Sequence, residues 1–206
     1  MTFIYDSDTS MLPSKSNSFN PFPGLRPFNQ EEDYLFFGRE QQIAELMTLL
    51  RQQRFTAVTG TSGSGKSSLV RAGLIPELQG GMMKEAGSDW ETLVLRPGGS
   101  PLRNLAAALA EGQMEDPNDP KVMGELLATL NHSGLGLVEA IRQGDFPDDC
   151  NILILVDQFE EIFRFQQSNA ANQEEAADFV ELLLEAGKQT RVPIYIIATM
   201  RSDYLG

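Results

Sequence analysis

Apolar residues recur with two different spacings along the chain. Over residues 40–52 they have helical spacing, at Ile43, Leu46, Met47 and Leu50. Residues 152–156 are instead consecutive aliphatics, typical of a strand that is buried on both faces. Further strands are predicted at residues 55–59, 92–95 and 193–199. Because these strands alternate with helical patterns, we predict an α/β fold with a parallel sheet flanked by helices.

The helical patterns and the polar segments divide the chain into three parts. Helices are also expected at residues 66–74, where Pro76 would end the helix, and at 101–109, 122–130, 135–142 and 174–188. Residues 1–18 are polar and predict a disordered lead. Residues 19–35 combine prolines with large apolar side chains, which favours an extended arm lying on a domain. Residues 36–206 form the predicted core.

Charge and cysteine usage narrow the classes of function. The formal net charge of −13 argues against a nucleic-acid-binding surface and against binding to an anionic membrane surface. The acidic excess is read as a solvated face rather than a site for a basic partner. A single cysteine, Cys150, excludes an intramolecular disulfide and is expected to fill the core. With no apolar run long enough to span a membrane, we expect a cytoplasmic protein.

A glycine-rich loop follows the strand at residues 55–59. Residues 60–67 read GTSGSGKS and match the phosphate-binding pattern G-x-x-x-x-G-K-[ST] at every fixed position. Its glycines let backbone N–H groups curl around phosphate oxygens, and the following helix directs its positive end at the same anion. Lys66 is expected to reach the β- and γ-phosphates, and Ser67 to bind Mg²⁺. A flexible Gly/Ser linker is the alternative, but the flanking strand and helix argue against it.

Acidic residues follow the apolar strand at residues 152–156. Asp157 is delivered at the carboxyl end of that strand, where doubly wound sheets bind ligands, so we expect it to hold Mg²⁺. The alternative is a helix N-cap. Glu160 and Glu161 come next, and either can orient an attacking water. They can instead be ordinary acids in the first turn of a helix, stabilised by its dipole.

The last predicted strand ends near two further polar residues. Thr199 and Arg201 are expected at the same sheet edge as the nucleotide, where such side chains can sense the γ-phosphate. Arg201 can instead pair structurally with Asp157, Glu160 or Asp203. Both interpretations stay open from the sequence.

Five ordered motifs resemble the STAND class of NTPases, the signal transduction ATPases with numerous domains, and most of all its novel STAND branch. They are NPFPGLRPF at 20–28, FFGRE at 36–40, the loop and helix at 60–74, DQFEE at 157–161 with Phe163, and TMRSD at 199–203. This resemblance implies an ASCE-type P-loop NTPase with strand order 5-1-4-3-2, of which strand 5 would be missing here, since relatives continue beyond the last strand.

The resemblance also implies site residues and partners. Gly38 and Arg39 would lie on the adenine side of the nucleotide, and an acid pair would follow the metal-binding aspartate. The nucleotide-binding set is then Gly38, Arg39, Gly60, Thr61, Ser62, Gly63, Ser64, Gly65, Lys66, Ser67 and Ser68. The metal ligands would be Ser67 and Asp157, and the catalytic candidates Glu160, Glu161 and Arg201.

The predicted function is a switch. With ATP and Mg²⁺ as cofactors, slow hydrolysis would be coupled to regulated self-association in signalling or defence, and effector or sensor domains would be present in longer relatives. The alternative is a module that binds nucleotide or a partner without turnover. A small-molecule kinase is disfavoured, because no arginine-rich lid segment follows Gly80.

Overall fold

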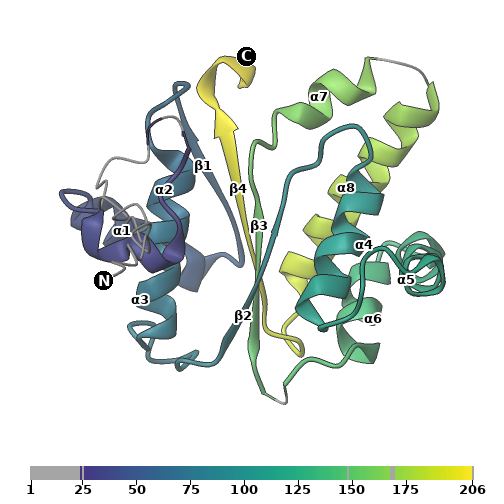
Figure 1. Ribbon diagram of the computed structural model, residues 1–206, viewed down its shortest axis with the longest axis horizontal. Helices are drawn as coiled ribbons and strands as arrows, with labels where there is room; N and C mark the ends of the chain where they lie inside the picture. The colour runs from purple at the N-terminus through teal and green to yellow at the C-terminus, as the bar shows by residue number, and fades with distance from the viewer. Residues whose placement is uncertain (1–23, 25, 148, 168–169, 206) are drawn as a thin grey trace, which may run out of the picture.

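The computed structural model describes residues 24, 26–147, 149–167 and 170–205. The predicted disordered lead and most of the NPFPGLRPF motif lie outside these residues. The described chain forms three layers, with a parallel sheet between two sets of helices (Figure 1). No helix in this described part combines the length and the apolar character needed to cross a membrane.

The sheet has four parallel strands in the order β1-β4-β3-β2. Their bounds are Phe55–Gly60 for β1, Trp90–Leu95 for β2, Asn151–Val156 for β3 and Ile194–Arg201 for β4. The five-strand order expected from the resemblance is not present in full, because the described residues add no strand beyond β1. All strands point the same way, so their carboxyl ends meet at one edge.

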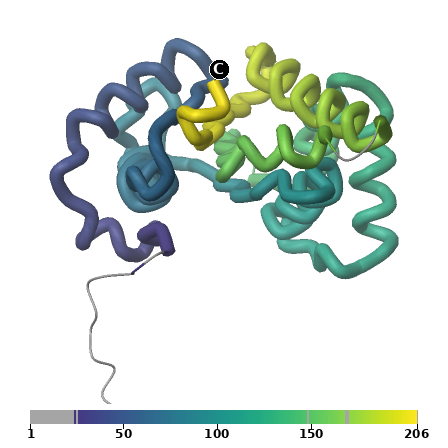
Figure 2. Tube along the Cα trace, turned by 90° about the horizontal axis from the view of Figure 1, so that it is seen from above, coloured from purple at the N-terminus to yellow at the C-terminus, as the bar shows by residue number. Residues whose placement is uncertain are grey.

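The helices lie on the two faces of this sheet. On one face, the chain forms a 3-10 helix η1 (Gln30–Leu35), α1 (Glu40–Gln52), α2 (Lys66–Ser68), a π-helical turn η2 (Leu69–Leu74) and α3 (Ile75–Gln79). The other face carries α4 (Pro101–Gly112), α5 (Pro120–His132), α6 (Gly136–Gln143), α7 (Glu161–Gln166) and α8 (Ala170–Lys188). A 3-10 turn η3 (Ser202–Tyr204) follows β4. Figure 2, which looks down on the carboxyl ends of the strands, shows the two groups apart, with the C-terminus between them.

Two apolar clusters hold these layers together. Alternate side chains of β3 belong to different clusters. Ile152 and Ile154 pack with α4 to α8, whereas Leu153 and Leu155 pack with α1, η2 and α3. Every residue of β3 is buried, as predicted for a strand covered on both faces. Cys150 is buried at the edge of the first cluster, which confirms its predicted role as core filling, and burial raises the pKa of its thiol.

The prediction that Pro76 ends the helix after the phosphate loop is wrong. Helical structure continues from Lys66 to Gln79, through α2, η2 and α3 without a break. Pro76 lies in the first turn of α3, directly after the π-helical turn. Because helical structure continues through this position, Pro76 removes one backbone donor from the helix without ending it.

Candidate functional site

The loop after β1 has the backbone geometry of a phosphate cradle. Gly63 and Gly65 have positive φ angles of 73° and 84°, which L side chains rarely adopt. A Cβ atom on Gly60 would lie 2.8 Å from Ser64 Oγ, so a larger residue there would require the Ser64 hydroxyl to move. The helix begins at Lys66 with Gly65 as its N-cap. Backbone N–H groups at a helix start are available to an anion.

Lys66 is turned back onto its own loop. Its Nζ donates to the carbonyl oxygens of Gly60 at 3.1 Å and Thr61 at 2.9 Å. The side chain also lines the open hollow described below. Carbonyl oxygens are neutral acceptors, so an anionic phosphate in that hollow would be a stronger partner for the ammonium group.

Asp157 is a fully buried carboxylate at the carboxyl end of β3. Its Oδ1 accepts hydrogen bonds from Ser67 Oγ at 2.6 Å and from Thr199 Oγ1 at 2.7 Å. Side-chain oxygen atoms of Ser67, Asp157 and Thr199, from α2 and the carboxyl ends of β3 and β4, therefore lie next to one another. The N-cap alternative is wrong, because α7 begins at Glu161 with Glu160 as its N-cap residue.

Two arginines neutralise the other carboxylate oxygen of Asp157. Arg71 Nη2 lies 3.1 Å from Oδ2, and Arg96 Nε lies 3.8 Å from it. Arg71 comes from η2 and Arg96 from the residue directly after β2. The Nε atom of Arg71 is buried without a hydrogen-bond partner in the part of the chain that the structure describes.

Glu160 and Glu161 point to different places. Glu160 is 7% exposed, lines the hollow, and accepts a hydrogen bond from the backbone N–H of Arg201 at 3.3 Å. Glu161 accepts a hydrogen bond from the backbone N–H of Gly98 at 3.0 Å, in the loop after β2. The pair is thus divided between a group that faces the hollow and a group that fixes a neighbouring loop.

Several of these residues line a hollow of about 640 Å³ at the carboxyl edge of the sheet. That volume is within the range of small-molecule sites. Four basic side chains line it against the single acid Glu160, although the whole chain carries a net charge of −13. The lining residues are Gly24, Arg26, Pro27, Phe28, Ser62, Gly63, Gly65, Lys66, Ser67, Ser68, Arg96, Gln158, Glu160, Thr199 and Arg201.

Comparison with family models identifies the family of this chain. Residues 21–206 match the model described as Novel STAND NTPase 1, or nSTAND1. The chain belongs to this family. The resemblance drawn from the motifs is confirmed by that match, which covers nearly the whole chain. No curated protein and no solved structure matched the chain.

Two further residues were predicted for the site of this novel STAND NTPase, Gly38 and Arg39. Arg39 Nη2 lies 3.4 Å from the carbonyl oxygen of Ser64, so it touches the phosphate loop. Gly38, with a positive φ of 80°, donates its N–H to Glu40 Oε1 at 2.9 Å. Neither Gly38 nor Arg39 is among the residues that line the hollow. Their predicted place near adenine stays a prediction.

Arg201 has a structural partner and also faces the hollow. Its guanidinium binds Asp203 through two hydrogen bonds of 3.1 and 2.6 Å, which lower the pKa of the Asp203 carboxyl. Of the three partners considered from the sequence, Asp203 is the one that its side chain binds, while Glu160 binds its backbone. Arg201 also lines the hollow, so a contact with phosphate is still open to it.

The sequence did not single out the arm as a wall of the site, nor Arg71 and Arg96. The Phe28 N–H donates to Ser68 Oγ at 3.1 Å, which joins the arm to the phosphate loop. Arg26 is paired with Glu32 at 2.5 Å, and its hydrogen bonds lower the Glu32 pKa to about 2. The sequence did contain a signal for Arg96, because this residue directly follows a predicted strand. Parallel strands bring such residues to the same edge as Asp157.

Proposed function

We propose that this chain binds ATP with Mg²⁺ and hydrolyses it slowly as a conformational switch in signalling or defence assembly. The observation that carries the proposal is that Lys66, Ser67 and Glu160 line one hollow, while the buried carboxylate of Asp157 accepts a hydrogen bond from Ser67. A phosphate-binding loop, a metal-binding carboxylate and an acid beside them are the parts that phosphoryl transfer requires. The ASCE type of P-loop NTPase is proposed on the same basis.

The chain's own residues divide the work of holding nucleotide. The backbone N–H groups of the loop and the Lys66 ammonium group would bind phosphate oxygens, with Lys66 leaving its two carbonyl partners. Phe28 and the arm would cover the side of the site next to Ser68. Arg201, held by Asp203, would face the phosphate from the end of β4. Gly38 and Arg39 are proposed to bound the adenine side.

The residues present fit a bound Mg²⁺ ion. Ser67, Asp157 and Thr199 offer oxygen atoms alone, which are the ligands this hard cation prefers. The described residues contain no cluster of three or more His, Cys, Asp and Glu side chains, so phosphate and water would complete the coordination. When bound, the ion would neutralise negative charge that develops on the phosphates.

Glu160 is the proposed group for orienting and polarising the attacking water. It faces the hollow, whereas Glu161 is engaged with Gly98. The backbone N–H of Arg201 holds one Glu160 oxygen and leaves the other for a water molecule. We assign Glu161 to positioning the loop after β2.

The test is a titration of a fluorescent ATP analogue with Mg²⁺ against the wild-type chain and Lys66→Ala. Losing one charge-assisted phosphate contact, worth about 1.5–3 kcal/mol, should weaken binding roughly tenfold to a hundredfold. Equal affinities would refute the assignment of the site. A turnover assay on the same samples separates the switch from its alternative, since a binding module would hold nucleotide without releasing phosphate.

Self-association is proposed through the open edge of β1. This strand pairs with β4 on one side, and no other described strand pairs with it. In the described part of the arm, η1 contacts η2 and α3, and Phe28 binds Ser68 of α2. An uncovered edge is a template for another strand. Light scattering over a concentration series with ATP and Mg²⁺ tests this, and a strictly monomeric chain with slow amide exchange at Thr56 to Val58 would contradict it.

Its compartment and partners are also proposals. We propose the cytoplasm, because a single buried, unpaired cysteine is typical of proteins that need no disulfide. We propose effector or sensor domains as partners of the switch, and neither nucleic acid nor membrane lipid as a direct ligand.

A further inference from the structure

We propose that Arg96 distinguishes a nucleoside triphosphate from a diphosphate by binding the terminal phosphate. This inference rests on the proposed function and adds a specificity-determining residue to the same site. Arg96 is placed at that site by the sheet itself. Leu95 and Val156 are register partners of β2 and β3, and Asp157 donates its backbone N–H to the Leu95 carbonyl at 2.8 Å. The residue directly after β2 therefore lies beside Asp157, and the Nε atom of Arg96 is 3.8 Å from Asp157 Oδ2.

The loop that begins at Arg96 is held by two side chains, Asn104 and Glu161. Asn104 Nδ2 donates to the carbonyl oxygens of Arg96 at 3.1 Å and Pro97 at 2.9 Å. Glu161 binds the Gly98 N–H from the start of α7. A side chain on so well anchored a loop can change its partner without moving the loop.

Of the two arginines at Asp157, Arg96 has the freedom to exchange partners. Its side chain is 50% exposed and lines the hollow, whereas that of Arg71 is 23% exposed and is not among the lining residues. Arg96 is also the more distant from the carboxylate, at 3.8 Å against 3.1 Å. Arg71 is therefore the fixed partner of Asp157, and Arg96 the exchangeable one.

A metal–triphosphate complex would favour that exchange for two reasons. A cation bound to Asp157 repels the guanidinium that shares this carboxylate. The terminal phosphate offers two oxygens to the planar fork of an arginine, a stronger partner than a carboxylate already shared with Arg71. A diphosphate lacks this terminal group, so Arg96 would stay at Asp157. The side chain would then report which nucleotide is bound.

Calorimetric titration of the full chain with Mg²⁺ and either ADP or a β,γ-imido analogue of ATP tests the proposal. Arg96→Ala should weaken binding of the triphosphate roughly tenfold to a hundredfold, with ADP affinity unchanged within about twofold. Arg96→Lys keeps the charge but lacks the fork, so it should show a smaller loss of the same selectivity. The control is Arg142→Ala, which should change neither affinity, because Arg142 is exposed and belongs to α6, a helix that lies away from the carboxyl ends of the strands (Figure 1).

The outcomes separate this inference from the one on which it rests. If the wild-type chain binds neither nucleotide, both proposals are wrong. If it binds both, and Arg96→Lys and Arg96→Ala leave the ratio of the two affinities unchanged, this inference alone is overturned. If Arg96→Ala does not fold, Arg96→Lys decides by the same ratio. Equal losses for ADP and the triphosphate would show that Arg96 merely shapes the site.

Discussion

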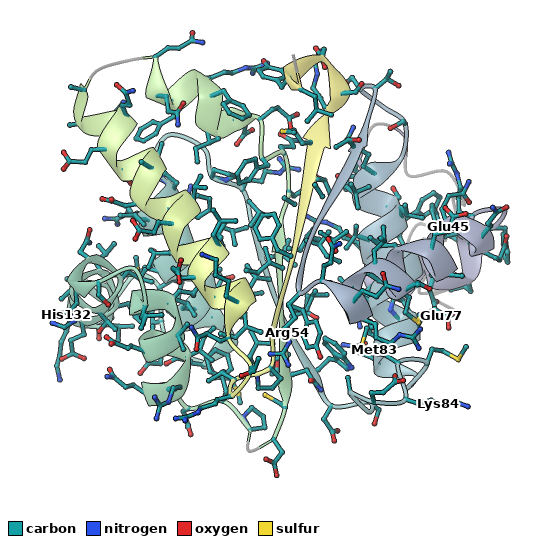
Figure 3. The ribbon with its side chains drawn as sticks, turned by 180° about the vertical axis from the view of Figure 1, so that it is seen from behind. Glu45, Arg54, Glu77, Met83, Lys84 and His132 are labelled. Carbon is teal, nitrogen blue, oxygen red and sulfur yellow. The ribbon has the colours of Figure 1, made fainter. Side chains whose placement is uncertain are left out.

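At the amino ends of the strands, Arg54 donates to the backbone carbonyls of Gln189 at 2.6 Å and Val192 at 2.9 Å. At the carboxyl ends, Arg71 and Arg96 share the carboxylate of Asp157. Figure 3 shows Arg54 at the base of the sheet, where its guanidinium also lies over the ring of Tyr195 at 5.2 Å. The same type of side chain thus has neutral, fixed partners at one end and a shared charge at the other.

This difference separates stability from binding within one sheet. At the amino end, Asn151 Nδ2 also donates to backbone carbonyls, those of Ala86 and Asp89. Backbone carbonyls belong to the fold, so a ligand has little to offer in exchange. The groups around Asp157 carry charges that a metal or phosphate can take over. We therefore expect substitutions at the carboxyl end to change nucleotide chemistry and those at the amino end to change the free energy of unfolding.

The largest effect is expected for Glu160→Gln. Loss of a group that polarises water should lower the turnover of ATP by about 10²–10⁴-fold, while ATP affinity changes little because the amide still accepts the Arg201 N–H. Single-turnover phosphate release and a binding titration measure the two quantities. Glu161→Gln is the matched control, since the oxygen of the new amide would still accept the Gly98 N–H. A larger loss of turnover in that control would reverse the roles of the two acids.

A smaller effect is expected for Asp157→Asn. The amide keeps an oxygen for Ser67 and Thr199 but loses the charge for Mg²⁺, so ATP should bind roughly tenfold more weakly in Mg²⁺. Affinity in EDTA should be nearly unchanged. Titrations in the two buffers measure this, and a matching loss in EDTA would make Asp157 a structural residue.

The smallest effect on nucleotide binding is expected at the amino end. Asn151→Ala should lower the free energy of unfolding by about 1–3 kcal/mol, because the carbonyls of Ala86 and Asp89 lose the side-chain donor of the buried Asn151. ATP affinity should stay within error of the wild-type value. Urea denaturation and a binding titration check both parts. A clear loss of affinity without a loss of stability would show that the two ends are not independent.

The elements of the fold were largely predictable because periodicity reports burial directly. The helix at Glu40–Gln52 and the aliphatic run of β3 lie where their patterns placed them. The helix beyond Pro76 was not predictable, because a π-helical turn precedes the proline and no residue pattern announces such a turn. Proline usually ends a helix, but here helical hydrogen bonding continues through η2 and α3 to Gln79.

Motifs located the candidate site, but the directions of its side chains were not predictable. Spacing alone left Glu160 and Glu161 equivalent within one helical turn. In the structure Gln158 has a φ of 58°, and its N–H and that of Phe159 bind Thr199, so the chain turns before α7 begins. Glutamine rarely adopts a positive φ, and the cause lies on another strand. Tertiary contacts of this kind set the direction of both acids.

The π-helical turn at Leu69–Leu74 has a consequence for how this sequence can be aligned and edited. Each hydrogen bond of a π-helix spans one residue more than in an α-helix. The turn therefore accommodates one more residue than an α-helical turn would at the same place. Deleting one residue between Ser68 and Pro76 would let this turn close as a plain α-helix, with α3 facing the same way relative to Lys66 and Ser67. Leu78 would stay in the core cluster, whereas Arg71, which lies inside the turn, would no longer point at Asp157. A homologue with a plain α-helix here should therefore align with a gap of one residue, and that gap would mark the loss of the arginine contact.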